Sequence, residues 1–303
     1  MARNGITPDP WEPVRDSSIR LPDSRTLAYA EWGDLHGRPV FLFHGMPGSR
    51  LFFPDPQAAT KGGVRAITVD RPGMGLSDPQ PGHVVADWPA DVVELAGALG
   101  LDRFGVVGWS AGTPYTFACA ALIPERLTGA AAMTSAASLR YLFDKDRELR
   151  ESLLDDDERA ILEALSEGGR DAAERRAAAD AVEFVEGLAE HPEQVAEGAD
   201  AGDEWFLEDP DRRRAFVESF REAVRQGAEA MSPEFVAQVT PWGFRLEDIS
   251  MPVHVWAGAN DAITPPELMR RVAERIPRHT FTVWEDVGHA GIAKHLDEVL
   301  AEL

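Results

Sequence analysis

The stretch RFGVVGWSAGTPYTFACAALI, residues 103–123, predicts a strand that turns sharply into a helix. Its first part is a short apolar run typical of a buried strand, and a helix is expected over 111–122. Between them stands Gly108-Trp109-Ser110-Ala111-Gly112, whose glycines let neighbouring backbones pass closely. Such a turn exposes its serine hydroxyl at a helix N-terminus, where free N–H groups favour developing negative charge. Ser110 is therefore a candidate nucleophile.

This five-residue pattern alone would occur by chance in roughly one chain in ten of this length, given ordinary glycine usage. The strand-to-helix context makes it more specific. An ordinary turn serine is the alternative interpretation of Ser110.

Seven further apolar runs accompany this strand and predict a sheet. Strands are expected at 18–21, 26–32, 39–44, 65–70, 103–109, 128–134, 253–258 and 280–286. Helices are expected at 86–99, 111–122, 265–276 and 291–302. Continuous apolar runs such as FLF and AITV suit strands that are buried on both faces. The alternation of strands and helices predicts an α/β fold with a mostly parallel sheet flanked by helices.

Residues 139–250 differ from the rest of the chain. They hold 30 acidic and 14 basic residues, a net charge of −16, and their periodicity is helical. We interpret them as a helical insertion, a cap or lid, within a core formed by 1–138 and 251–303. Inserted segments at the functional edge of a scaffold commonly act as lids.

The composition limits the possible partners. The net charge of −22 argues against nucleic acid and anionic membrane surfaces. No apolar run approaches the roughly 18 residues of a membrane span, and the N-terminus lacks the apolar core of a secretory signal. A cytoplasmic protein is expected, of undetermined oligomeric state. The single cysteine, Cys119, allows no internal disulfide and is interpreted as a buried structural thiol.

A second glycine-rich turn, His44-Gly45-Met46-Pro47-Gly48, directly follows the expected strand at 39–44. Acyl transfer needs two N–H donors aimed at the carbonyl oxygen of its tetrahedral intermediate. The amides of Met46 and Ala111 are the candidates for this oxyanion hole. Pro47 restricts the backbone of Met46, and His44 is interpreted as shaping the loop.

A serine nucleophile needs a base, and histidine has a suitable resting pKa. Among eight histidines His289 is preferred, because it follows the last strand at the edge where Ser110 is expected. Asp261, just after the strand at 253–258, is the candidate that orients the imidazole. Asp286 and Asp144 are the alternatives.

Taken together, HGMPG, DRPGMGLSD (70–78), GWSAG, GANDAITP (258–265) and GHAG resemble the α/β-hydrolase superfamily over nearly the full length. The resemblance implies an eight-stranded sheet with a helical cap between strands six and seven. Asp70 and Arg71 are expected to shape a loop near the site. Dehalogenases and epoxide hydrolases of the superfamily use an aspartate where this chain has Ser110. Prolyl aminopeptidase-like members typically carry Trp after the serine rather than before it.

The resulting hypothesis is a serine hydrolase that cleaves a carboxylic ester or lactone of a small to medium apolar substrate through an acyl-enzyme, without metal or cofactor. The alternatives are a carbon–carbon bond hydrolase, a thioesterase or amidase, a perhydrolase, a prolyl aminopeptidase-like enzyme, or a ligand receptor or cyclase. The expected substrate-binding residues are Trp109, Phe143, Trp205 and Trp242.

Overall fold

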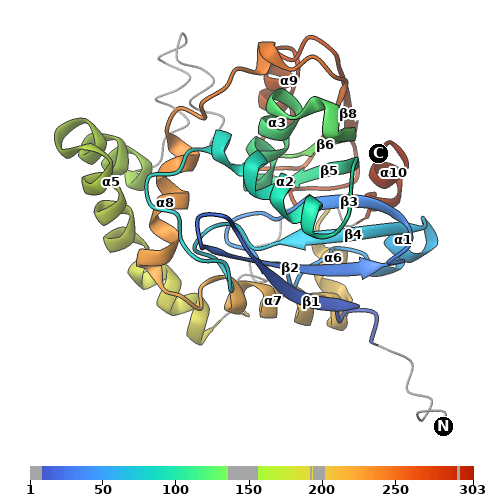
Figure 1. Cartoon of the computed structure of the whole chain (residues 1–303), viewed down its shortest axis with the longest axis horizontal. Coiled ribbons are helices and arrows are strands. Elements are labelled where there is room, and N and C mark those ends of the chain that lie inside the picture. The colour runs from blue at the N-terminus through green and yellow to red at the C-terminus, as the bar shows by residue number, and fades with distance from the viewer. Residues whose placement is uncertain (1–8, 136–155, 192, 194–201, 292–293) are drawn as a thin grey trace.

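The fold is seen in a computed structural model that describes residues 9–135, 156–191, 193, 202–291 and 294–303 (Figure 1). Eight strands form one sheet in the order β1-β2-β4-β3-β5-β6-β7-β8. Their bounds are Arg15–Arg20 (β1), Thr26–Gly33 (β2), Arg38–Phe43 (β3), Val64–Val69 (β4), Phe104–Trp109 (β5), Leu127–Met133 (β6), Val253–Gly258 (β7) and His279–Trp284 (β8). β1 and β2 pair antiparallel, β2 also pairs antiparallel with β4, and the other neighbours are parallel. The predicted mostly parallel, eight-stranded sheet is confirmed.

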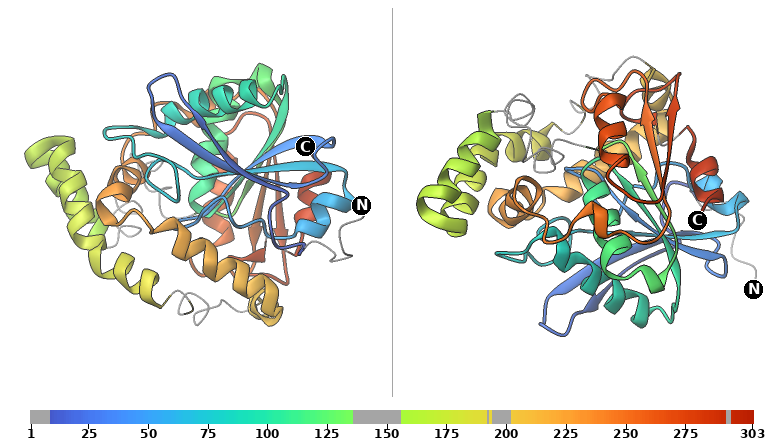
Figure 2. Two further views of the ribbon diagram at one scale, coloured as in Figure 1. Left: turned by 60° about the horizontal axis from the view of Figure 1, so that its bottom comes forward. Right: turned by 90° about the horizontal axis from the view of Figure 1, so that it is seen from above.

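Alternate side chains of the central strands enter two cores, one on each face of the sheet. On β3, Phe41 and Phe43 join the larger core, whereas Val40 and Leu42 join the other. The larger core lies under α2, α3 and α9, and the other lies under α1 and α10 (Figure 2). These helices span Pro56–Lys61 (α1), Trp88–Ala98 (α2), Thr113–Leu122 (α3), Pro266–Ala273 (α9) and Leu296–Ala301 (α10). Short 3-10 turns lie at Val85–Asp87 (η1), Ser110–Gly112 (η2), Pro124–Arg126 (η3) and Leu246–Asp248 (η6).

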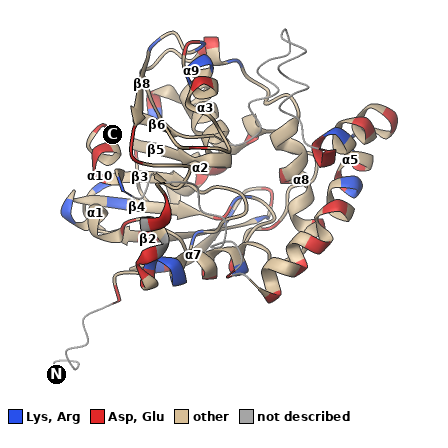
Figure 3. Ribbon diagram, turned by 180° about the vertical axis from the view of Figure 1, so that it is seen from behind, with Lys and Arg blue, Asp and Glu red and all other residues tan. Residues whose placement is uncertain are grey.

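The chain between β6 and β7, residues 134–252, is called the β6–β7 segment below. Its described elements are the helices α5 (Asp156–Glu190), α6 (Glu204–Glu208), α7 (Pro210–Ala223) and α8 (Ala228–Val239), with η6. α5 is interrupted at Gly169, whose φ is 75°, and it lies along α8 at one side of the sheet (Figure 1). Acidic and basic residues follow the ribbons of α5 and α7, while β5 and β6 carry none (Figure 3). The helical character of the segment agrees with the sequence, and the domain boundaries at 138/139 and 250/251 stay a prediction.

The last helix begins later than the sequence predicts. A helix was expected over 291–302, but α10 begins at Leu296. His295 is the N-cap of α10 and makes no side-chain capping bond, so no residue typical of a helix start marks this position in the sequence. Within the described ranges, no helix combines the length and apolar character of a membrane span.

Candidate active site

Ser110 lies in a strained turn between β5 and α3. Its φ is 54°, in the left-handed region that a residue with a Cβ seldom adopts. The turn requires close approach on both sides. A Cβ on Gly112 would lie 2.0 Å from the carbonyl oxygen of Phe43, and one on Gly108 would lie 2.5 Å from that of Gly112. The two glycines of the sequence pattern are therefore steric requirements of the turn that presents Ser110.

The structure brings the three predicted triad residues together. Ser110 Oγ lies 2.9 Å from His289 Nε2, and His289 Nδ1 lies 3.0 Å from Asp261 Oδ2. The three residues follow the carboxyl ends of β5, β8 and β7, which share one edge of the sheet. Ser110 is 8% exposed, and the His289 side chain is 14% exposed. A hydroxyl, an imidazole and a carboxylate are thus connected in a chain of hydrogen bonds that a small molecule can reach.

Asp261 is held by its own loop and by Thr134, which directly follows β6. The backbone amides of Ile263 and Thr264 donate to its Oδ1 at 3.0 and 2.7 Å, and the Thr134 hydroxyl donates to Oδ2. These bonds fix the carboxylate that faces His289. The rival Asp286 is exposed and pairs with Lys294, and Asp144 lies outside the described residues.

The loop that carries His289 is anchored from the β6–β7 segment. The two carboxylate oxygens of Asp203 accept from the amides of Gly288 and Ala290 at 2.9 and 2.8 Å. The indole of Trp109 donates to the carbonyl oxygen of His289 at 3.0 Å. Sequence reasoning missed Asp203, because nothing local distinguishes it among the acidic residues of the segment.

The loop after β3 passes beside the serine. A Cβ on Gly45 would lie 3.3 Å from Ser110 Cβ and 3.7 Å from its Oγ, so Gly45, the residue before Met46, borders the hydroxyl. Ala111 is buried at the head of the turn on the other side. Both amides predicted for the oxyanion hole therefore belong to segments that adjoin Ser110. Burial and the charge of Arg71 lower the pKa of His44 to about 3, so its ring is neutral and shapes this loop, as expected.

The four expected substrate-binding residues have different outcomes. Trp109 lies beside the site, with its ring centroid 6.3 Å from that of His289. Trp242 has no exposed surface and stacks on Phe244 in the larger core, a position that argues against the predicted contact with substrate. The backbone of Trp205 belongs to α6, but its side chain lies outside what is described, as does all of Phe143.

An aromatic cluster that the sequence did not single out extends from Trp109. The rings of Phe52 and Phe216 each lie 6.3 Å from the Trp109 ring, and Phe206 and Phe220 continue the cluster at 5.1 and 4.6 Å from Phe216. Three of these rings come from α6 and α7: Phe206, Phe216 and Phe220. The β6–β7 segment therefore packs aromatic side chains against Trp109, and this aromatic surface is called the apolar wall below.

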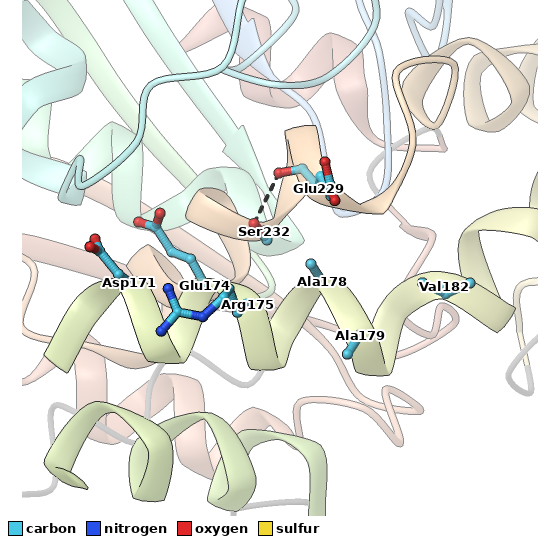
Figure 4. A pocket seen from close by; sticks show the side chains of 8 residues that line it. All are labelled: Asp171, Glu174, Arg175, Ala178, Ala179, Val182, Glu229 and Ser232. Carbon is cyan, nitrogen blue, oxygen red and sulfur yellow. Dashed lines mark hydrogen bonds between the residues drawn. The ribbon is translucent and has the colours of Figure 1, made fainter. Parts of the chain in front are cut away.

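A separate cavity of about 560 Å³ lies between α5 and α8 (Figure 4). Its lining includes Asp171, Glu174, Arg175, Val182 and Glu229, and no triad residue. In the part of the chain that the structure describes, no group of three or more His, Cys, Asp or Glu side chains is arranged to hold a metal ion.

Known proteins match part of this chain in sequence. The chain is 32% identical to a proline iminopeptidase of Xylella fastidiosa over 124 residues, 38% of each chain. It is 36% identical to a putative carbamate hydrolase RutD of Caulobacter sp. over 105 residues, 31% of this chain and 38% of that protein. The chain therefore spans about two fifths of the length of these curated relatives.

Solved structures match over almost the whole chain. An esterase from Thermogutta terrifontis has a TM-score of 0.63 at 22% identity, covering 95% of this chain and 96% of that one. An enol-lactonase from Burkholderia xenovorans LB400 has a TM-score of 0.64 at 18% identity, covering 94% and 97%. At such identities the likeness shows the fold alone. The model of the alpha/beta hydrolase fold family matches residues 38–296, most of the chain and all three triad positions. The protein belongs to the α/β-hydrolase family.

Proposed function

We propose that this protein is a serine hydrolase that cleaves a carboxylic ester or lactone of a small to medium apolar substrate. The observation that carries the proposal is the continuous chain of hydrogen bonds from Ser110 Oγ through His289 to Asp261. It supplies a nucleophile, a base within 2.9 Å and an orienting carboxylate, the arrangement that acyl transfer requires.

The reaction would proceed through an acyl-enzyme. Ser110 Oγ attacks the carbonyl carbon while its proton passes to His289 Nε2, and the carbonyl oxygen becomes an oxyanion that the Met46 and Ala111 amides stabilise. His289 then donates the proton to the leaving alkoxide. A water molecule attacks the acyl group in turn, giving its proton to His289, which returns it to Ser110. Asp261 stabilises the imidazolium in both halves.

The apolar wall supports the substrate class. Trp109 lies next to His289, and the uncharged rings of Phe52 and Phe216 pack against Trp109. Such a surface favours an apolar acyl or alcohol group over a charged one. The structural neighbours named as an esterase and an enol-lactonase carry related activities on the same fold.

A second candidate is a proline iminopeptidase, favoured by the relatives of that name. Release of an N-terminal residue requires recognition of its ammonium group, for which a carboxylate is the natural partner. Among the residues that the structure describes, the two buried carboxylates that the β6–β7 segment brings to the loops around Ser110, Asp203 and Glu234, are both occupied by protein groups. We therefore rank this candidate second.

Labelling and a substrate panel test both candidates. A fluorophosphonate probe should label the wild-type chain at Ser110, and Ser110→Ala should be unlabelled while Ser166→Ala, a change at an exposed serine, is labelled normally. Turnover of p-nitrophenyl esters of graded chain length is expected to exceed that of prolyl p-nitroanilide. Faster turnover of the anilide would favour the iminopeptidase, and absence of labelling would refute both.

A further inference from the structure

A buried ion pair lies beneath the loop that follows β3. Arg71 Nε lies 2.7 Å from Glu234 Oε1, and both side chains are 0% exposed. Arg71 belongs to the DRPG stretch after β4, and Glu234 belongs to α8 of the β6–β7 segment. Full burial of two charges is costly unless every polar atom is engaged, and the triad mechanism uses neither group.

The other end of the guanidinium holds the loop itself. Arg71 Nη2 donates to the carbonyl oxygen of Gly45 at 3.2 Å, and Nη1 donates to that of His44. Nδ1 of His44 also lies 2.7 Å from the Gly45 oxygen. The planar arginine fork, fixed at Nε by Glu234, thus fixes the direction of two consecutive carbonyls.

The direction of the Gly45 carbonyl determines where the Met46 amide points. The Gly45–Met46 peptide is trans. In a planar trans peptide the C=O and the following N–H point in opposite directions. With the Gly45 oxygen turned toward Arg71, the Met46 N–H faces away from the ion pair, and Gly45 itself lies beside Ser110.

The same carboxylate reaches the other side of the serine through Gln238, one turn further along α8. Gln238 Nε2 donates to Glu234 Oε1 and to the carbonyl oxygen of Ala111, each at 3.1 Å. Glu234 is therefore connected, through one intermediate side chain each, to both segments that carry the proposed oxyanion donors.

Glu234 is held in its charged form. Burial opposes the charge, but Arg71, His83 and the Tyr115 hydroxyl together hold the pKa of the carboxyl well below its usual range. His83 Nε2 and Tyr115 Oη lie 3.2 and 2.6 Å from its Oε2. Since Arg71, Gln238 and Tyr115 all donate to it, a neutral amide at this position could not replace the carboxylate without disturbing them.

We propose that Glu234 is a positioning residue for the oxyanion hole: through Arg71 it sets the Gly45–Met46 peptide so that the Met46 N–H is directed at the developing oxyanion. The inference rests on the proposed serine hydrolase function. It makes a helix of the β6–β7 segment part of the apparatus that stabilises the transition state, beyond any role in covering the substrate.

The test compares two glutamates that undergo the same substitution. Glu234→Gln removes the charge that holds Arg71. Glu222→Gln is the matched control, because Glu222 on α7 also pairs with a core arginine, Arg50, at 2.6 Å and lies outside the loop of residues 44–48. For Glu234→Gln we expect kcat for a p-nitrophenyl ester to fall about 10- to 100-fold with KM within about twofold, because a misdirected donor loses part of the oxyanion stabilisation. Glu222→Gln should keep its kcat.

Binding of an alkylboronic acid gives a readout that does not depend on turnover. Boron bonds to Ser110 Oγ as the hydroxyl proton passes to His289, giving a tetrahedral, negatively charged boronate with a hydroxyl oxygen in the position of the oxyanion. With selective ¹⁵N labelling of the seven methionines, the Met46 amide should shift on boronate binding in the wild type and in Glu222→Gln. In Glu234→Gln the shift should be lost, and boronate affinity should fall by the same factor as kcat.

A folded Glu234→Gln with wild-type kcat, boronate affinity and Met46 shift would overturn the inference while leaving the proposed function intact. If Glu234→Gln does not fold, Arg71→Lys decides, since lysine keeps the charge but lacks the fork. Arg71→Lys with unchanged kcat and boronate affinity would equally overturn it. A wild-type chain that neither hydrolyses esters nor binds boronate would instead refute the proposed function, and this inference with it.

Discussion

The sheet edge and the β6–β7 segment contribute different kinds of groups to the surroundings of Ser110. At the edge, short loops after β5, β7 and β8 place His289 within hydrogen-bond distance of both Ser110, at 2.9 Å, and Asp261, at 3.0 Å. The segment carries a net charge of −16, and most of the charged residues that the structure describes in it lie on exposed helix faces (Figure 3). Two of its carboxylates, Asp203 and Glu234, are instead buried against the loops of the core. The edge carries the three residues of the proposed triad, and the segment carries groups that hold the loops around them.

The largest expected effect lies at the edge itself. Asp261→Asn should lower kcat by roughly 10³- to 10⁴-fold, because an amide cannot keep the imidazole in the required tautomer or stabilise its charged form. Ester hydrolysis under saturating substrate measures the loss. Asp286→Asn, at the exposed rival carboxylate, should stay near the wild-type rate. A small effect at Asp261 with a large one at Asp286 would reverse the assignment.

The next effect concerns stability rather than turnover. Trp242→Ala should lower the free energy of unfolding by about 3–5 kcal/mol, because a large buried ring leaves a cavity in the larger core. Urea unfolding measures this change. The folded fraction should keep its KM toward esters of different chain length. An altered chain-length preference at unchanged stability would restore Trp242 as a substrate-binding residue.

A smaller loss is expected where the segment holds the His289 loop. Asp203→Asn should lower kcat roughly 10- to 30-fold. The asparagine oxygen can accept from one of the two backbone N–H groups that flank His289, but the other N–H group would then face the asparagine NH₂, which is a donor. Steady-state kinetics and the pH dependence of kcat measure it.

Asp209→Asn provides the control for that change. The Asp209 carboxylate also accepts from two backbone amides, those of Asp211 and Arg212, but it caps α7 and lies outside the loops of the triad. Equal losses of kcat in the two variants would mean that Asp203 acts only through general stability.

The smallest effect is a dependence of stability on pH. The pKa of Glu234 is depressed in the folded protein, so its charged form contributes stability above the unfolded pKa near 4.3, and that contribution is lost as the pH falls below about 5. Between pH 5 and pH 3 the wild type should lose about 1–2 kcal/mol more than Glu234→Gln. Urea unfolding at several pH values measures the difference, and parallel curves would contradict a depressed pKa.

Local patterns were sufficient to predict much of the fold. All eight expected strands match observed ones within a few residues, because each strand at the centre of the sheet is a continuous apolar run. The start of α10 at Leu296 differs from the prediction, because its N-cap, His295, makes no side-chain capping bond and is not a typical capping residue. The sequence also could not show that Trp242 packs in the core, since an aromatic residue in an insertion has the same sequence pattern whether it faces a core or a ligand.

By itself, the sequence determined the strained serine turn, the order of the three triad residues and the strands that carry them, because glycine spacing and apolar runs are local properties of the chain. Only the tertiary structure decided which carboxylates of an acidic segment are buried and what they hold. Arg71 and Glu234 are 163 positions apart. Hydrogen bonds between such distant residues depend on how the helices of the β6–β7 segment lie against the sheet, and no periodicity in the sequence records that arrangement.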